Sequence, residues 1–395
     1  MKKIKNLKSV LFRILVFVLV VVMIVFLPSV KLKQNQDLEN IYGVFLGNKS
    51  KYQGIIEIWN IDSFEAGNKS KTSLLTEISK EYQKKNKGVY FMVRNLTENE
   101  CLGLAEKGEI PDLISCSYGV AEKLRPYIKE YSSIDENYFE NGAKALILST
   151  EKKFAVPWCK GGYFLISTRD KLEKAKIEDV NNVKLSNIAF SSGYVVKGKK
   201  SDKTIYSLGF GNYKYLMPQM ALKTYNGNEV GLVSKYAYDE DTRGISSYTA
   251  YCEFIADESV ILLGTQRDVF RMKNRETQGK VSDLILEQVF GFTDLIQFVM
   301  LGKNLSGDKL FVAEDFVRFL TGELSQNIIL NSGLFSVTNI SNKSGITGIM
   351  QNIIPQNFSD YTAPRVFIDE NEINNLQKFW LIIKGFLWIN SNDFW

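Results

Sequence analysis

The sequence predicts an α/β fold, and a strand–helix–strand pattern after residue 54 is the first observation behind this prediction. Residues 54–61, GIIEIWNI, are rich in strand-forming side chains. In residues 74–88, apolar side chains recur at helical spacing, and Gly88 is suited to end that helix. Residues 89–96, VYFMVRNL, have the composition of a second strand. Because two strands joined by a helix form a right-handed crossover, the first sheet should be largely parallel.

The length and composition of the chain are the second and third observations. A single core rarely grows beyond roughly 250 to 300 residues, and the chain has 395. Its hydrophobic content of 45% and charged content of 24% are typical of folded proteins. The sequence therefore predicts two packed domains.

An apolar segment near the N-terminus predicts a membrane helix or a signal peptide. Residues 10–30 would span roughly 30 Å as a helix, about the thickness of a hydrocarbon core. No A-x-A-like cleavage site follows, and no cysteine near Pro28 could accept a lipid, which favours an uncleaved anchor over a cleaved signal. The first thirteen residues carry five basic side chains and no acid, so the positive-inside rule places the remaining chain outside the cell. Residues 34–53 are polar and predict a tether.

Charge and residue usage exclude several classes of function. The whole net charge of +5 lies in that N-terminal segment, so the rest of the chain lacks the basic stripe of a nucleic-acid-binding protein. The chain has no histidine, which excludes imidazole bases and histidine metal sites. Its four cysteines show no C-x-x-C spacing, so we expect no metal, and one or two disulfides remain open.

Residues 154–168, FAVPWCKGGYFLIST, combine strand-forming residues with residues that interrupt strands. Pro157 and the Gly161–Gly162 pair would weaken a central strand. One interpretation is an ordinary strand, a turn and a second strand. The segment by itself does not show whether this interpretation is correct.

The carboxyl ends of the predicted strands indicate where a ligand would lie. In an open α/β sheet, ligands bind beyond these ends, which points to residues 59–65 and to Ser117–Tyr118. The alternative is that Trp59 and Tyr118 are core aromatics.

Three later segments add elements to this pattern. Residues 257–271 predict a short strand ending at Gly264 and Thr265, followed by Arg267, Asp268 and Arg271. Residues 314–338 predict one amphipathic helix, closed by Gly333, with a broad apolar face formed by Phe316, Phe319, Leu320, Leu324 and Ile328. Residues 371–390 are too apolar for a free surface helix, and we expect them to dock against a domain.

The order of these segments resembles the extracellular solute-binding proteins of ABC importers, in the sugar-binding, maltose-binding-protein-like branch (family 1). The resemblance covers about residues 54–345. It rests on the segments IEIWN, KKNKGVYFMV, KGEIPDLI, KKFAVPWCKGGYFLIST, ESVILLGTQRDVFR and FVRFLTGELSQNIILNSGLFSV.

The resemblance implies a type II periplasmic-binding-protein-like fold, in which two α/β lobes are joined by crossing hinge strands. The chain would cross near residues 157–162, leaving Trp158 facing the cleft, and recross near 291–293 and 333–337. Proline and glycine are tolerated in a crossing segment and can absorb the backbone change of closure. The expected divisions are 1–33 for the anchor or signal segment, 34–53 for the tether, 54–157 with 294–333 for the N-terminal lobe, and 158–293 with 334–395 for the C-terminal lobe.

The resemblance also implies a function. We expect a non-catalytic, membrane-tethered monomer at the extracellular face of the cell membrane. It would need no cofactor and would deliver a small solute, most simply a sugar, to an ABC permease. A sugar site needs aromatic planes and polar groups. The expected planes are Trp59, Tyr118, Trp158 and Tyr163, and the expected polar groups are Asp62, Glu65 and Arg267.

The chain departs from the family pattern in ways that keep alternatives open. It lacks the usual lipid-accepting cysteine, and Gln266 and Arg267 stand where the sugar-binding branch often has an aromatic residue. One alternative is a glycosidase using Asp62 and Glu65 as paired carboxylates. Another is a ligand sensor without a transport partner.

Overall fold

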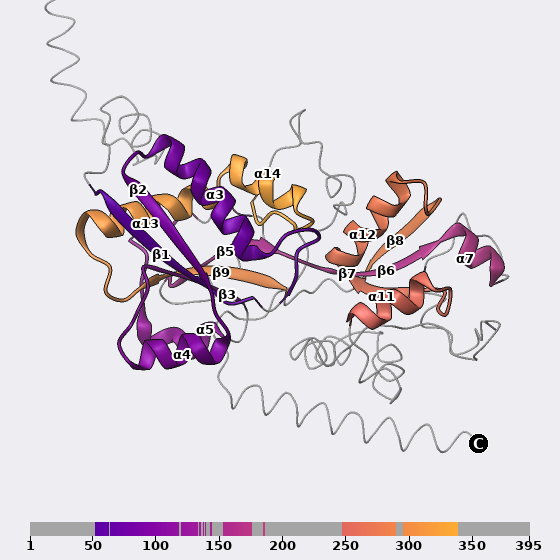
Figure 1. The fold of residues 1–395 in the computed structure, drawn as a ribbon, viewed down its shortest axis with the longest axis horizontal. Coiled ribbons are helices and arrows are strands. Elements are labelled where there is room, and N and C mark those ends of the chain that lie inside the picture. Colours follow the sequence, from indigo (N-terminus) through magenta and orange to yellow (C-terminus); the bar gives the residue numbers. More distant parts are fainter. Residues whose placement is uncertain are drawn as a thin grey trace, which may run out of the picture. The chain divides into compact units, whose positions relative to one another are not determined.

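The computed structural model describes most of the chain between residues 52 and 338. The described residues are 52–62, 64–117, 120–132, 153–175, 247–289 and 295–338, with single positions at 134, 135, 137, 139, 143 and 185. They form a mixed α/β fold with two sheets (Figure 1). The predicted membrane segment 10–30, residues 34–51 of the tether and the apolar segment 371–390 lie outside them. Within the described part, no helix has both the length and the apolar character needed to cross a membrane.

The larger sheet contains six strands. They are β1 (Gly54–Asn60), β2 (Val89–Asn95), β3 (Leu113–Ser117), β4 (Ile128–Lys129), β5 (Ala155–Lys160) and β9 (Ile296–Gly302). The order is β2-β1-β3-β9-β4, and β5 also pairs with β9. β1 is parallel to β2 and β3, whereas β9 is antiparallel to β3, β4 and β5. The predicted parallel strand–helix–strand unit is therefore confirmed.

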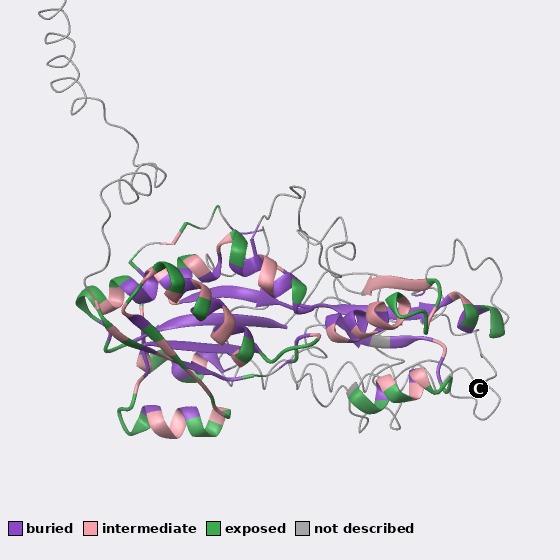
Figure 2. Ribbon diagram, turned by 45° about the horizontal axis from the view of Figure 1, so that its top comes forward, coloured by how far each residue is buried: buried purple, intermediate pink, exposed green. Residues whose placement is uncertain are grey.

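Helices cover both faces of the larger sheet. One group is α3 (Lys71–Lys85), α13 (Gly307–Leu320) and α14 (Glu323–Asn331), and the other is α4 (Glu98–Glu106), α5 (Ala121–Leu124) and the 3₁₀ turn η1 (Arg125–Tyr127) (Figure 1). Along β1, Ile56 and Ile58 join the buried cluster that contains α3 and α13 residues, while Trp59 joins the cluster that contains α4 and α5 residues. This is the alternation of a strand buried on both faces. Strands β3, β5 and β9 are buried along their whole length in Figure 2, whereas β2 is only partly buried.

The first helix begins and ends where local chemistry predicts. Ser70 caps α3, because its side chain accepts a hydrogen bond from the backbone N–H of Ser73 at 3.1 Å. Lys84 and Lys85 occupy the last turn, where positive charge is favourable. Gly88 has a φ of 92°, a left-handed conformation that glycine adopts easily, and it turns the chain into β2.

The smaller sheet is antiparallel, with the order β7-β6-β8. Its strands are β6 (Tyr163–Thr168), β7 (Leu262–Thr265) and β8 (Leu284–Val289), and the helices near it are α7 (Arg169–Lys174), α11 (Ser247–Ile255) and α12 (Gln266–Thr277). The predicted strand ending at Gly264 and Thr265 is confirmed as β7. Asp268, in the first turn of α12, completes a capping box with Thr265.

The prediction of one helix over residues 314–338 was wrong. α13 ends at Leu320 and α14 begins at Glu323. Gly322 takes an extended conformation between them, with a ψ of 162°, which ends the helical run. As a result Leu324 is exposed rather than part of a continuous apolar face. Gly333 ends α14 as predicted, with a φ of 85°.

The four cysteines are all free, which settles the question of disulfides that the sequence left open. Cys101, Cys116 and Cys159 are buried, and Cys252 is exposed.

Candidate functional site

The chain changes from the larger to the smaller sheet at Gly161 and Gly162. β5 pairs with β9 as far as Lys160, with a bulge between Pro157 and Cys159, and β6 of the smaller sheet begins at Tyr163. The proline and the glycines thus have separate roles: the bulge lies inside the larger sheet, and the glycine pair forms the link.

Two other segments of the chain lie beside this link. The backbone groups of Lys160 and Phe335 exchange hydrogen bonds at 3.2 and 2.8 Å, and Gly161 N–H donates to Leu295 O at 2.6 Å. Of the predicted crossing segments, 157–162 and 333–337 are therefore joined through their backbones, whereas 291–293 lies outside the described residues. A Cβ at Gly161 would lie 2.3 Å from Gln266 Oε1 and 3.0 Å from Leu295 Cβ, so only glycine fits without displacement.

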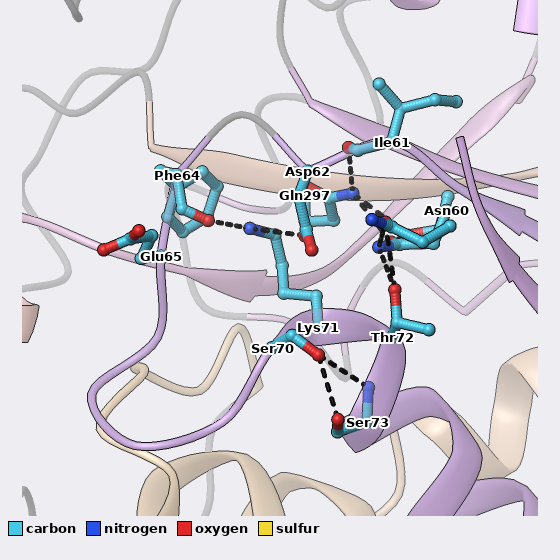
Figure 3. Close-up of polar contacts among 12 residues, drawn as sticks. Asn60, Ile61, Asp62, Phe64, Glu65, Ser70, Lys71, Thr72, Ser73 and Gln297 are labelled. Carbon is cyan, nitrogen blue, oxygen red and sulfur yellow. Dashed lines mark hydrogen bonds and ion pairs between the residues drawn. The ribbon is translucent and has the colours of Figure 1, made fainter. Parts of the chain in front are cut away.

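A buried polar network lies at the end of β1 beside this link. Ser115 Oγ donates to Asn60 Oδ1 at 2.9 Å. Gln297 Nε2 lies 3.1 Å from Ser115 Oγ, 3.3 Å from Asn60 Oδ1 and 3.1 Å from the carbonyl oxygen of Ile61 (Figure 3). The side chains come from three strands, β1, β3 and β9, and all are inaccessible to solvent. The network fixes the point at which the loop after β1 begins, because buried polar groups hold their partners in place.

Lys71, the first residue of α3, holds that loop in place. Its side chain is fully buried, and its Nζ lies 3.0 Å from Asp62 Oδ1. The same ammonium group donates to the carbonyl oxygen of Phe64 and lies 3.8 Å from the centre of the Phe64 ring (Figure 3). The carboxylate, carbonyl and ring together compensate the buried charge, so the loop between Asp62 and Phe64 is tied to the first residue of α3.

The same loop contacts α12, which packs beside the smaller sheet. Arg267 forms an ion pair with Glu65. Gln266 Nε2 donates to the backbone oxygen of Glu65 at 2.8 Å, and Gln266 Oε1 accepts from Gly162 N–H at 3.1 Å. Gln266 therefore connects the loop after β1 to the glycine link.

Phe270 extends this contact by packing on two glycines. A Cβ at Gly67 would lie 2.4 Å from Phe270 Cγ, and a Cβ at Gly333 would lie 2.8 Å from the same ring and from Gly67 Cα. Gly67 N–H also donates to Ser332 O at 2.8 Å. The loop after β1, the start of α12 and the end of α14 thus meet, and we take this junction as the candidate functional site.

Comparison with solved structures identifies the fold. No protein-family model matches the chain, and no curated protein does. The GacH receptor of Streptomyces glaucescens, solved unliganded and with acarbose, has a TM-score of 0.60 and 12% identity, covering 85% of this chain and 93% of its own. A maltose/maltodextrin-binding domain, MalE of Bdellovibrio bacteriovorus bound to maltotriose, has a TM-score of 0.57 and 13% identity, covering 85% and 94%. Thiaminase I of Bacillus thiaminolyticus has a TM-score of 0.58 and 10% identity, covering 84% and 100%.

The chain has a periplasmic-binding-protein-like fold. This agrees with the α/β fold predicted from the sequence and with its resemblance to binding proteins of two lobes. In an open α/β sheet, a ligand is expected beyond the carboxyl ends of the parallel strands, and the end of β1 is one of these.

The predicted aromatic residues are buried in this structure. Trp59, Trp158 and Tyr163 are at most 1% exposed. Trp59 Nε1 donates to Glu57 Oε1 at 2.8 Å, and Trp158 Nε1 donates to Ser115 Oγ at 3.2 Å. The expectation that Trp158 faces a cleft therefore differs from the structure, in which it belongs to the core. Tyr118 lies outside the described residues.

The predicted polar residues lie at the junction. Glu65 and Arg267 contact one another, and Asp62 is held nearby by Lys71. The glutamate side chain is 62% exposed and the arginine side chain 18%. Burial, together with the positive charge of Arg271, lowers the pKa of Arg267 below its ordinary value. Arg267 is therefore a cation with an interrupted water shell, a state that favours an anionic partner.

Sequence reasoning missed the residues that hold the junction together. Lys71 lies between the predicted strand over residues 54–61 and the helical pattern of residues 74–88, where the sequence gives no signal of a buried cation. Gln297 had a signal, because an amide inside the apolar run of residues 295–301 is expected to be buried and hydrogen-bonded. Among the described residues, no group of three or more Cys, Asp or Glu is placed to hold a metal ion.

Proposed function

We propose that this chain is a non-catalytic solute-binding protein that takes up a small solute at the junction between two lobes. One lobe would contain the larger sheet and the other the smaller sheet. The boundary predicted after residue 157 would move to Gly161 and Gly162, because β5 continues in the larger sheet as far as Lys160. The observation that carries the proposal is the set of contacts made by Gln266, which joins the loop after β1 to the glycine link between the sheets. A solute bound at this point would touch both lobes and would favour their approach.

The backbone of the link supports a hinge. Gly161 and Gly162 form a two-residue connection. Gly161 N–H donates to the carbonyl oxygen of Leu295, and the preceding residue Lys160 exchanges backbone hydrogen bonds with Phe335. Hinges are a few residues at element ends that absorb a change in φ and ψ. To move a population from 1:99 to 99:1, a solute must favour the closed state by about 5.5 kcal/mol, which requires contacts from both lobes.

A carbohydrate is the class of solute that the structural neighbours favour. The GacH receptor was solved with acarbose and the MalE domain with maltotriose. The proposal includes delivery to an ABC permease at the extracellular face of the membrane, with residues 10–30 as the anchor. The family resemblance and the N-terminal charge pattern support this part. The protein would act as a monomer and would use no cofactor.

A thermal-shift screen of the full-length protein in detergent, against sugars, polyols and amino acids, tests the proposal. A ligand present at 100 times its Kd adds about 2.7 kcal/mol to the free energy of unfolding. We expect at least one compound to raise the Tm in a saturable manner, and small-angle scattering to show a decrease in the radius of gyration on binding. Failure of every class to shift the Tm, or binding without any compaction, would contradict the proposal.

A matched pair of glutamine variants tests whether the solute binds at the junction. Gln266→Ala removes the connection between the loop and the glycine link, so it should weaken solute binding. Gln278→Ala changes an exposed glutamine at the other end of the same helix and should leave binding unchanged. Equal affinities for the two variants would exclude the junction as the binding site.

An enzyme is the second candidate, because one structural neighbour is named thiaminase I. The glycosidase alternative requires Asp62 and Glu65 to act on a sugar, but each carboxylate is engaged by a cation in this structure. A cysteine nucleophile requires a lowered pKa, whereas burial raises the pKa of Cys159, the cysteine in β5. We expect the wild-type protein not to hydrolyse chromogenic glycosides. If it did, and if both Asp62→Asn and Glu65→Gln abolished the hydrolysis, an enzyme would be favoured.

A further inference from the structure

Helix α12 carries three arginines in a row on one side, spaced by four residues. Arg267, Arg271 and Arg275 follow one another along successive turns, so their guanidinium groups are neighbours on the helix surface. The row starts at the junction, because Arg267 is the residue that contacts Glu65. We call Arg267, Arg271 and Arg275 the arginine row.

The acids of the same helix are engaged elsewhere. Asp268 Oδ2 accepts a hydrogen bond from the backbone N–H of Thr265 at 3.0 Å and caps the helix. Glu276 binds Lys273 Nζ at 2.7 Å and the backbone N–H of Leu284 at 3.0 Å. Asp268 is buried close to the row and offsets part of its charge, but it forms no salt bridge with an arginine in the part of the chain described here.

Two donors of the row are shielded from water without an acceptor. Arg271 Nη1 and Arg275 Nε are buried atoms, and neither has a hydrogen-bond partner among the described residues. A buried donor without a partner is costly, most of all in a charged group. The Arg271 guanidinium also lies 5.2 Å from the ring centre of Tyr251, within the range of a cation–π contact that restrains its position. The arginine row is therefore restrained in position, and some of its hydrogen-bond donors lack an acceptor.

An anion would supply the hydrogen-bond acceptors that the arginine row lacks. A guanidinium offers two parallel N–H groups that match the oxygens of a phosphate or a carboxylate. Burial is the main cause of the lowered pKa of Arg267, and the positive charge of Arg271 adds to it. An anion between the two guanidinium groups would offset both effects. Glu65 supplies part of that charge to Arg267 from an exposed loop, a position from which it can be displaced.

We infer that the solute of this protein is anionic, and that the arginine row receives its phosphate or carboxylate group while its remaining part lies at the junction. The inference rests on the proposed function and specifies its substrate class: a phosphorylated or acidic sugar, or a similar small acid, in place of a neutral sugar. Glu65 occupies Arg267 in the absence of the solute and competes with it.

Inorganic phosphate and paired sugars test the inference in the full-length protein. By isothermal calorimetry at low ionic strength, phosphate should bind wild type, and either glucose 6-phosphate or glucuronate should bind more tightly than glucose. The better of the two acidic sugars shows whether the row accepts phosphate or carboxylate. Glu65→Gln should tighten phosphate binding, because it removes the competing carboxylate.

Arg271→Gln is the decisive variant, and Arg318→Gln is its control. Arg318 is an exposed arginine of α13 that pairs with Asp315, away from the row. Arg271→Gln should weaken phosphate binding by about tenfold or more, Arg271→Lys should give an intermediate loss, and Arg318→Gln should have no effect. Without phosphate, Arg271→Gln should leave the Tm unchanged or raise it, since it removes an unsatisfied buried donor. A structural role for Arg271 would instead lower the Tm.

The contrary outcomes separate this inference from the proposed function. Neutral sugars that bind wild type and Arg271→Gln equally, with no response to phosphate, would overturn the inference and leave a solute-binding protein. Equal phosphate binding by wild type, Arg271→Gln and Arg318→Gln would also overturn it, because binding would then be non-specific. If no ligand bound, shifted the Tm or made the protein more compact, the proposed function would be contradicted as well.

Discussion

The indole nitrogen of Trp158 donates a hydrogen bond to Ser115 Oγ at 3.2 Å, and neither side chain reaches solvent. This contact joins β5 to β3 across the intervening strand β9. Ser115 is also bound by Asn60 and Gln297. Trp158 is therefore part of the framework that positions the loop after β1.

Truncation of Trp158 should destabilise the protein as a whole. Trp158→Ala leaves a large cavity and should lower the free energy of unfolding by about 3–5 kcal/mol. Trp158→Phe keeps most of the volume and removes one hydrogen bond, so its cost should be about 1–2 kcal/mol. Chemical denaturation of the two variants measures both values.

Phe311→Ala is the control for these variants. Phe311 is 48% exposed, and its truncation should change the free energy of unfolding by no more than about 0.5 kcal/mol. If Trp158→Ala were as stable as Phe311→Ala but bound solute less well, Trp158 would be a ligand contact after all.

More of the fold than of the site could be predicted from the sequence, and individual residues show why. Hydrophobic periodicity and capping chemistry are local, so the strand over residues 54–61, its following helix and the left-handed Gly88 were accessible from the sequence. The break between α13 and α14 was missed because the apolar spacing continues past Gly322, which takes an extended conformation between the two helices.

The site depends on contacts between residues far apart in the chain, which composition does not encode. Glu65 and Arg267 were each named as polar candidates, but their ion pair connects positions some two hundred residues apart. An aromatic residue in a strand has the same local pattern whether it faces a ligand or the core. Trp59, Trp158 and Tyr163 were therefore assigned to the ligand, whereas packing on both faces of the sheets buries them.

Neutralisation of Asp62 should destabilise the loop after β1. Asp62→Asn leaves the fully buried ammonium group of Lys71 with the Phe64 carbonyl and ring as its partners. Because Asp62 is itself partly exposed, the loss should be about 2 kcal/mol, below the usual cost of breaking a fully buried pair. Glu77→Gln is a suitable control, since Glu77 pairs with Lys69 on the surface and should contribute less than about 1 kcal/mol. Equal losses in the two variants would show that the burial of Lys71 has no energetic consequence.

A comparison of two glycines should isolate the packing of Phe270 at the junction. Gly333 and Gly307 both have positive φ, at 85° and 55°, so alanine at either position incurs a backbone cost of about 1–2 kcal/mol. A Cβ at Gly307 meets no atom within 4 Å, whereas a Cβ at Gly333 would meet the Phe270 ring and Gly67 Cα at 2.8 Å. Gly333→Ala should therefore destabilise the protein by about 1–3 kcal/mol more than Gly307→Ala. Equal denaturation midpoints would show that Phe270 moves aside at no cost.

The cysteines should differ sharply in their reactivity toward alkylating reagents. Burial raises the pKa of Cys101 to about 12 and raises the pKa of Cys116 and Cys159 as well, so few thiolates form at neutral pH. Cys252 is exposed on α11. We expect iodoacetamide to label Cys252 in the native protein and to label the other three only after denaturation, as peptide mass spectrometry would show. Rapid native labelling of Cys159 would mean that β5 opens readily beside the glycine link, and the packing of Trp158 against Ser115 would then not be a permanent feature of the fold.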